Sequence, residues 1–396
     1  MRRNLSIALA VMLIIGCATA PYTGRSQLML VSEGQEAALG EDAYRHTLRD
    51  SVVTHDINAE NIVRRVGAKI AAVANKPEYK WEFSIINDPE TVNAFAVPGG
   101  KVAVYTGIFG PARDEAGLAV VLGHEVAHAL ARHPAERMSQ DMLVQLGGVG
   151  LGVALGNNPA MANLLLQAYG IGVALPFSRS QESEADHIGL ILMAKAGYDP
   201  RVAIDLWERM EKKESGRSAP PEFLSTHPGY ETRVQQIRSF LPEALSYYRP
   251  TGAEIERLPS AEALDTAVAR AERELLKRLA AINGFVDQQN GERVVVEALA
   301  YQLRVNPQLV LQERQQLQLG YGPYAALRGV AYLGRGSMSR IAADYQRGRS
   351  WSEIATANGS RISELITWTG ELIRTTNSLG RQPKSPQLRP NPRWRP

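Results

Sequence analysis

The chain has 396 residues and a mass of 43.3 kDa, enough for two domains of about 150 to 200 residues each. Hydrophobic residues make up 44% and charged residues 21%, a globular composition that excludes collagen, a coiled coil and bulk disorder. The net charge of +3 is too small to indicate a nucleic-acid-binding protein, so we expect no nucleic-acid partner.

The first 17 residues have the pattern of an export signal. Two arginines precede an apolar run, residues 5–16, whose helical length of roughly 18 Å is too short to cross a bilayer core of roughly 30 Å. The run ends at Cys17, the only cysteine of the chain. We expect residues 1–17 to be a lipoprotein signal because 14–17 resembles a bacterial lipobox, in which the cysteine is lipidated and becomes the first mature residue. The alternative is an ordinary secretory signal with an incidental cysteine.

The predicted anchor also suggests a location. A lipidated Cys17 leaves no thiol for a disulfide, so the fold depends on its core alone. By the same resemblance to lipoproteins, Ala18 favours the outer membrane of a Gram-negative cell. We therefore expect a lipid-anchored protein in the outer membrane, facing the periplasm.

Residues 32–250 have the pattern of a mainly helical α+β domain. Apolar residues recur at helical spacing in 32–49, 58–74, 114–132 and 180–196. Segments 81–87, 93–97 and 101–105 predict a small sheet, with a Pro-Gly-Gly turn at 98–100. Two apolar, glycine-rich segments, 142–156 and 161–177, are too short and too often interrupted by polar residues to span a membrane, so we interpret them as buried helices.

The sequence changes character in its last third. Residues 241–259 are irregular and contain three prolines, so we place the domain boundary there. Residues 260–378 predict an all-α C-terminal domain of unknown role. Residues 380–396 carry five prolines and five basic residues without an acidic one, and we expect a disordered basic tail.

The sequence His124-Glu125-Val126-Ala127-His128 matches the H-E-x-x-H pattern. Residues four apart lie on one face of a helix, so His124 and His128 can bind one zinc ion. Glu125 can then reach a water molecule at the metal as general base. The alternative is a helical histidine pair without a metal.

A catalytic zinc ion needs a third protein ligand, and residues 178–186 offer one. Glu182 and Asp186 lie four apart on a second predicted helix and so face the same way. We assign Glu182 to the metal and Asp186 to the free N–H of a ligand histidine, most plausibly His124. Glu184 points away from that face, and we interpret it as a solvated carboxylate.

Taken together, these residues resemble the M48 family of metallopeptidases. The resemblance rests on the residues from His124 to His128 and from Ser178 to Asp186, on Gly189, and on two further blocks, 93–107 and 225–233. It implies a gluzincin-like fold with one zinc ion per subunit, ligand-bearing helices and a short edge strand that holds a peptide substrate. The lipobox favours the periplasmic lipoprotein type within the family.

The mechanism expected from these residues is zinc-assisted hydrolysis, with Glu125 passing a proton to the leaving amine. Residues 92–97 can bind an extended substrate by strand addition, which suits unfolded or misassembled clients; the alternative is an ordinary edge strand. His227 has two functional interpretations, a donor to the oxyanion or a switchable fourth zinc ligand, beside a purely structural one, with Arg233 as a weaker partner.

The remaining histidines lack ligand spacing, and we interpret them as surface or supporting residues: His46, His55, His133 and His187. The leading hypothesis is a zinc metalloendopeptidase that cleaves misfolded or misassembled periplasmic and outer-membrane proteins, attached to the membrane through Cys17. The alternative is a chaperone or assembly factor for outer-membrane proteins that uses the same fold.

Overall fold

The computed structural model describes residues 17–20, 23–146, 177–214, 227, 230–250, 252 and 254–380. They form two units, each with its own hydrophobic core. The main division falls between Asp265 and Thr266, and the short segment Arg49–Val52 groups with the second unit. The division falls a few residues after the expected boundary because a short helix, α12 (Ala261–Leu264), inserts Leu264 into the first core.

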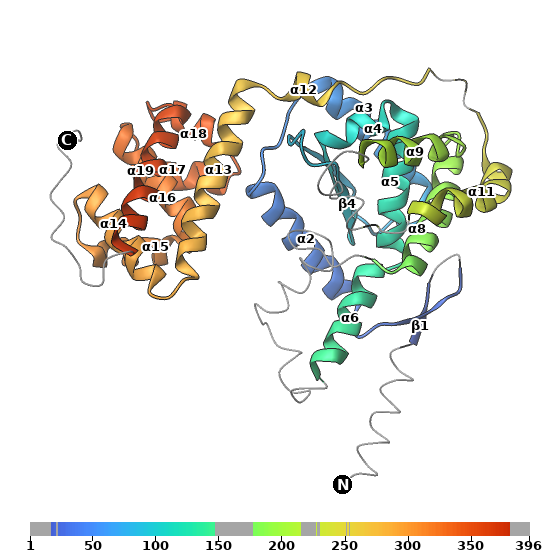
Figure 1. Ribbon diagram of the computed structural model, residues 1–396, viewed down its shortest axis with the longest axis horizontal. Helices are drawn as coiled ribbons and strands as arrows, with labels where there is room; N and C mark the ends of the chain where they lie inside the picture. The colour runs from blue at the N-terminus through green and yellow to red at the C-terminus, as the bar shows by residue number, and fades with distance from the viewer. Residues whose placement is uncertain are drawn as a thin grey trace, which may run out of the picture. The chain divides into compact units, whose positions relative to one another are not determined.

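The first unit combines helices with two small sheets (Figure 1). Its elements before the central helix are β1 (Cys17–Thr19), β2 (Ser26–Leu28), α2 (Glu33–Arg49), α3 (Ile57–Val73), β3 (Glu82–Ile86), β4 (Ala94–Val97), β5 (Lys101–Tyr105), η1 (Thr106–Ile108) and α4 (Phe109–Ala112). From the central helix onward they are α5 (Glu115–Leu130), α6 (His133–Leu146), α8 (Arg179–Lys195), α9 (Val202–Glu214), α11 (Tyr230–Tyr247) and α12. The predicted mainly helical α+β fold is confirmed.

The larger sheet has the strand order β3-β5-β4, so β4 lies at an edge. β3 runs parallel to β5, and β4 runs antiparallel to it after a turn in which Gly99 and Gly100 adopt φ values of 89° and 88°. Side chains alternate across β4: Ala94 and Ala96 join the main core with α3 and α5, whereas Phe95 packs with α2. The sheet is therefore buried between helices on both faces.

Helices α5 and α8 form the centre of the first unit and pack against each other (Figure 1). Asp114 caps the start of α5 by accepting a hydrogen bond from Gly117 N–H. Ser178 caps α8 in a reciprocal capping box with Gln181. All residues of α5 are buried, and the two helices approach most closely at Gly123 and Gly189, where an added Cβ would meet backbone atoms at 2.8–2.9 Å.

The β1–β2 hairpin was not predicted from the sequence, although Cys17 forms its first residue. The two strands pair antiparallel, with Cys17 opposite Leu28. Gln27 inserts its side chain into the first unit and donates to the carbonyl oxygen of Ala131, just after α5. The hairpin is therefore attached to the region where α5 ends and α6 begins.

The second unit is entirely helical in its described residues. Its helices are α13 (Ala267–Val286), α14 (Gly291–Leu303), α15 (Pro307–Leu317), α16 (Tyr321–Leu333), α17 (Met338–Gln346), α18 (Trp351–Ala357) and α19 (Ile362–Gly380). Trp368 of α19 is fully buried at the centre, where α13, α14 and α16 pack against α19. Most of the two predicted apolar segments, the apolar part of the signal and the basic tail lie outside the described residues.

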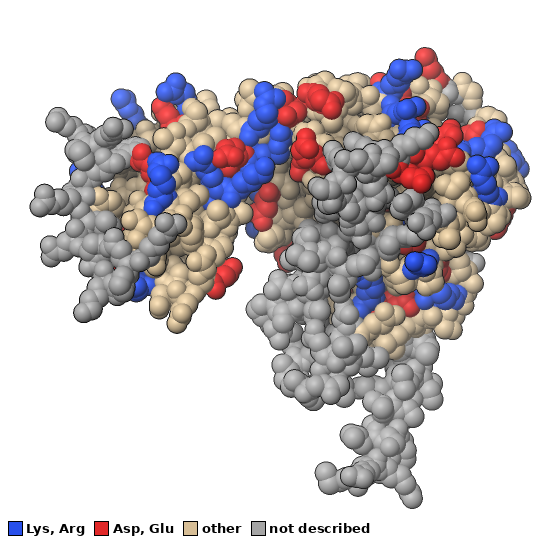
Figure 2. All heavy atoms as spheres, in the orientation of Figure 1, with Lys and Arg blue, Asp and Glu red and all other residues tan. Residues whose placement is uncertain are grey.

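Among the described residues, no helix has the length and apolar character needed to span a bilayer. Basic and acidic side chains are interspersed on the face shown in Figure 2, over each of the two units.

Candidate metal centre

Four side chains from three parts of the first unit converge on one point: His124, His128, Glu182 and His227. His124 Nε2 lies 3.0 Å from His128 Nε2 and 3.2 Å from His227 Nδ1. Glu182 Oε1 lies 3.0 Å from His227 Nδ1 and 3.4 Å from His128 Nε2. All four side chains are buried. They come from α5, from α8 and from a residue three positions before α11.

The spacing of these atoms fits a zinc ion. Zinc bonds of about 2.0–2.1 Å in a tetrahedral arrangement place ligand atoms about 3.3 Å apart. Five pairs of donor atoms in the cluster lie 3.0–3.5 Å apart, and one donor atom from each of the four residues lies within 4.8 Å of the others. Imidazole nitrogens and a carboxylate are the donors that zinc prefers. Three carboxylates lie near the cluster, those of Glu125, Glu182 and Asp186. Together with the guanidinium of Arg233 they carry a net charge of −2 when ionised, which a divalent cation balances.

Asp186 and Arg233 support the ligands from behind. Asp186 Oδ1 accepts from His124 Nδ1 at 3.0 Å, which leaves His124 Nε2 to face the cluster. Arg233 donates to Glu182 Oε2 at 2.9 Å and to Asp186 Oδ1 at 2.7 Å, and its guanidinium lies 3.6 Å from the centre of the Trp207 ring. One fully buried arginine therefore fixes both acidic residues of α8.

The surroundings set the protonation of each ligand. Burial lowers the pKa of His128 well below its usual value, so its Nε2 is an unprotonated ligand. Burial alone would raise the pKa of Glu182, but the charges of His227 and Arg233 outweigh it and lower that pKa well below 4.5. For His124, burial is outweighed by Asp186 and Glu182, which raise its pKa to about 9. A bound cation therefore replaces a proton at His124.

Glu125 lies beside the cluster but does not join it. Its Oε1 atom is buried without a hydrogen-bond partner in the described part of the chain and lies 3.6 Å from Nε2 of His227. Burial raises the pKa of Glu125 above its ordinary value. A buried carboxylate with a raised pKa next to a metal site is suited to accept and return a proton.

The expected solvated carboxylate, Glu184, is instead buried, and this interpretation was wrong. Its Oε2 lies 3.0 Å from Nε2 of His133, and the other ring nitrogen of His133 lies 2.9 Å from Nδ1 of His128. The face of α8 opposite the cluster is covered by α6 and the β1–β2 hairpin, from which Arg25 contacts Glu184. Helical spacing alone gave no signal for this contact because the hairpin was not predicted.

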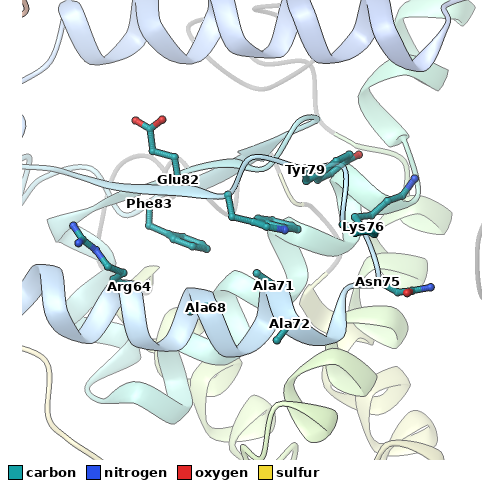
Figure 3. A pocket seen from close by; sticks show the side chains of 11 residues that line it. Arg64, Ala68, Ala71, Ala72, Asn75, Lys76, Tyr79, Glu82 and Phe83 are labelled. Carbon is teal, nitrogen blue, oxygen red and sulfur yellow. The ribbon is translucent and has the colours of Figure 1, made fainter.

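The other histidines lie away from the cluster. His46 and His55 are exposed, and His187 stacks on Phe240 and contacts Glu243. A groove of about 750 Å³ lies between α3 and β3 (Figure 3). Its lining includes Ala68, Ala71 and Ala72 of α3 and the aromatic residues Tyr79 and Phe83. None of the cluster residues lines this groove.

Comparisons with known proteins agree with the site. The sequence profile described as Peptidase family M48 matches residues 58–241. The chain is 39% identical over 227 residues to the mitochondrial metalloendopeptidase OMA1 of Schizosaccharomyces pombe, covering 57% of this chain and 66% of the relative. It is 36% identical to OMA1 of Saccharomyces cerevisiae, covering 58% of this chain and 70% of the relative. It is 30% identical to the Beta-barrel assembly-enhancing protease of Escherichia coli, covering 56% of this chain and 47% of the relative.

These matches contradict the expected location in a bacterial outer membrane facing the periplasm. The yeast relatives, together with plant and human proteins of the same name, are mitochondrial, and the Escherichia coli protein is a weaker match. The lipobox-like pattern at Cys17 gave a wrong prediction because a short apolar run followed by one cysteine does not determine the cellular compartment of a protein. The ligand cluster and the matched sequence establish that the chain belongs to peptidase family M48, a family of zinc metallopeptidases.

Proposed function

We propose that the chain is a zinc-dependent endopeptidase whose substrates are misfolded or misassembled proteins. The observation that carries the proposal is the set of four buried ligand atoms within 4.8 Å of one another, with Glu125 Oε1 beside them and without a hydrogen-bond partner in the described part of the chain. The names of the relatives, metalloendopeptidase and assembly-enhancing protease, support the peptidase activity. Because the matches cover only part of each relative, substrates and partners are inferred for this chain from its own geometry.

Each residue of the site has a distinct role in this proposal. His124, His128 and Glu182 hold the zinc ion, which when bound polarises the scissile carbonyl group and lowers the pKa of water. Glu125 removes a proton from the attacking water and delivers it to the leaving amine. Asp186 and Arg233 keep His124 and Glu182 in place, so the ligands are preorganised before substrate arrives.

His227 occupies the place of a fourth ligand. Its Nδ1 lies 3.0–3.2 Å from Glu182 Oε1 and His124 Nε2, within the same cluster of donor atoms. A catalytic zinc site keeps one position open, whereas four protein ligands close it. We therefore assign the described arrangement to a resting state, from which His227 withdraws when the enzyme acts.

The edge strand β4 is suited to hold the substrate. The Tyr105 N–H donates to the Asn93 carbonyl, and bonding alternates along an antiparallel strand, so the main-chain groups of Ala96 point away from β5. Among the described residues no strand pairs with that outer side, and β4 packs against α5, which carries two ligands. Strand addition there selects an extended chain rather than a particular sequence, which favours unfolded clients.

Two further parts of the proposal concern partners. The partners that this site favours are unfolded or misassembled proteins. Attachment to a membrane through a lipid on Cys17 stays a prediction, as does the lack of a nucleic-acid partner. Mass spectrometry of Cys17 in purified protein tests the lipid directly.

The test of the activity is Glu125→Gln in the full chain. We expect one zinc ion per chain in both proteins, with cleavage of unfolded casein lowered by about 10²- to 10⁴-fold in the variant because the general base is lost. Glu208→Gln on α9 replaces a surface carboxylate and serves as the matched control, with unchanged cleavage. Protein that binds no zinc, or a Glu125→Gln variant that cleaves normally, would contradict the proposal.

The same variant separates proteolysis from an assembly role. If Glu125→Gln prevents aggregation of a denatured client as well as the wild type does, while cleaving nothing, the chaperone or assembly function is favoured. If protection is lost together with cleavage, the peptidase accounts for the function.

A further inference from the structure

A continuous series of contacts joins the N-terminal hairpin to the zinc ligand His128. It starts at Arg25, which precedes β2, and passes through Glu184 of α8 to His133 of α6. It ends at Nδ1 of His128, 2.9 Å from Nδ1 of His133. Three separate elements therefore converge behind one ligand, on the side opposite the ligand cluster.

The hydrogen positions along this series follow from the ligand cluster. His128 faces the other donors with Nε2, so its hydrogen is on Nδ1. That N–H can donate only if Nδ1 of His133 accepts, which places the hydrogen of His133 on Nε2. The His133 Nε2–H then donates to Glu184 Oε2 at 3.0 Å. This assignment of hydrogens gives each ring nitrogen in the series a partner. The Glu184 carboxylate can only accept, so it determines that the hydrogen bonds run from His128 through His133 to Glu184.

Arg25 is the residue that holds Glu184. Its Nε donates to Glu184 at 2.8 Å, while its two terminal nitrogens bind Glu136 of α6 side by side at 2.7 Å each. The side chains of Glu136 and Glu184 are only 5% and 4% exposed, so each needs a partner. Thr23 also donates to Glu184, and Gln181 donates to Glu136 at 2.9 Å.

We propose that Arg25 is a positioning residue of the zinc site, which acts through Glu184 and His133 to fix the orientation and tautomer of His128. The proposal rests on the assignment of His128 as a zinc ligand in the proposed function. It gives the two ligand histidines different supports: His124 donates directly to the carboxylate of Asp186, whereas His128 reaches its carboxylate through a second imidazole. Of these two supports, only that of His128 depends on a residue outside the helices, namely Arg25 in the β1–β2 hairpin.

The test measures zinc binding and site geometry rather than peptidase activity. In full-length Arg25→Ala, competition with a fluorescent chelator is expected to show zinc affinity lowered by about 10- to 100-fold, as for loss of other supporting partners. The visible absorption of the cobalt-substituted protein is expected to change because the His128 ring reorients. Arg25→Lys keeps the charge but not the forked contact, and we expect it to recover part of the affinity.

The chain offers a closely matched control in Arg45. It binds Glu82 with two parallel contacts and Glu41 with a third through Nε, the same pattern as Arg25, but away from the ligands. Arg45→Ala is expected to leave zinc affinity and the cobalt spectrum unchanged. An equal loss of affinity in both arginine variants would show a general effect of destabilisation and overturn the proposal.

Glu184→Gln keeps the test decisive if Arg25→Ala folds poorly. The change preserves volume, and Arg25 retains its pair with Glu136, yet the charged acceptor for His133 is lost. We expect zinc affinity to fall and the cobalt spectrum to shift in the same direction. Unchanged affinity and spectrum in Glu184→Gln would overturn the inference while wild-type protein still binds zinc and cleaves casein. Failure of the wild type itself to bind zinc would instead refute the proposed function.

Discussion

At the ligand cluster, the position of His227 is the feature from which we propose a resting and an active state. Its Nδ1 contacts Glu182 and His124, while its Nε2 is turned toward Glu125 at 3.6 Å. One ring nitrogen of His227 thus faces two of the proposed zinc ligands, and the other faces the proposed general base. In the described arrangement the ring therefore lies where a fourth zinc ligand would bind.

His227→Ala is expected to bind zinc more weakly but to cleave unfolded casein faster at saturating zinc. If the closed arrangement is about ten times more populated than the open one, the gain is on the order of tenfold. Cleavage rates with zinc content measured in the same samples provide the check. His187→Ala, a histidine of α8 that stacks on Phe240, is the matched control and should change neither quantity. Slower cleavage with unchanged zinc content would show that His227 serves as an oxyanion donor instead.

Residue spacing predicted the side of the site that carries the zinc ligands, but not the contacts behind His128. The pairs His124–His128 and Glu182–Asp186 were found because residues four apart share a helical face, and all four lie at the cluster. The same rule correctly turned Glu184 away from the metal but could not show what covers that side. Arg25 gave no signal because its contact spans 159 positions along the chain.

Among the helices, the contact between α5 and α8 sets the distance between ligands. A Cβ on Gly189 would lie 2.9 Å from the His124 nitrogen and 3.0 Å from the Gly123 carbonyl carbon. Backbone atoms cannot rotate out of the way, so any larger residue moves one helix relative to the other. Because α5 carries two histidine ligands and α8 carries Glu182, the displacement changes the ligand spacing directly.

Gly189→Ala is therefore expected to lower the free energy of unfolding by about 1–3 kcal/mol and to weaken zinc binding. Thermal unfolding and chelator competition measure the two effects. Gly284→Ala in α13 is the matched control, because an added Cβ there meets nothing within 4 Å. It should be neutral or stabilising by up to about 1 kcal/mol. Unaltered zinc affinity in Gly189→Ala would show that the helices can adjust without moving the ligands.

Element prediction succeeded where the pattern was long or strictly alternating. The helices at 32–49, 58–74, 114–132 and 180–196 and the three strands of the larger sheet all appear within two or three residues of their expected limits. The β1–β2 hairpin was missed because its strands have three residues each, too few for a periodic signal. The sheet order, with β4 at the edge, depends on contacts between segments and was not readable from any one of them.

At the scale of the whole molecule, the two units have separate cores. The first core surrounds α5 and α8, and the second surrounds Trp368. The zinc ligands belong only to the first unit. Prolines mark the segment in which the sequence predicts the boundary, but the role of the helical unit is not encoded in any recognisable motif.

Thermal unfolding of the full chain is therefore expected to show two transitions, one for each core. Removing zinc with a chelator should lower the midpoint temperature of the first unit's transition only, because the ion stabilises the unit that binds it. Trp368→Ala should affect the second unit's transition only, by lowering the unfolding free energy of that unit by about 3–5 kcal/mol. Calorimetry of the wild type, the chelated protein and the variant checks both. A single transition that responds to both changes would show that the cores unfold as one.

The place of Arg25 in the hairpin has a practical consequence for how this enzyme is produced. A shortened version that starts at α2 lacks Arg25, which contacts both Glu184 and Glu136. If Arg25 positions His128 as proposed, such material loses metal more readily, and its slow turnover would be mistaken for a property of the enzyme. Versions made for assay therefore need to retain the hairpin.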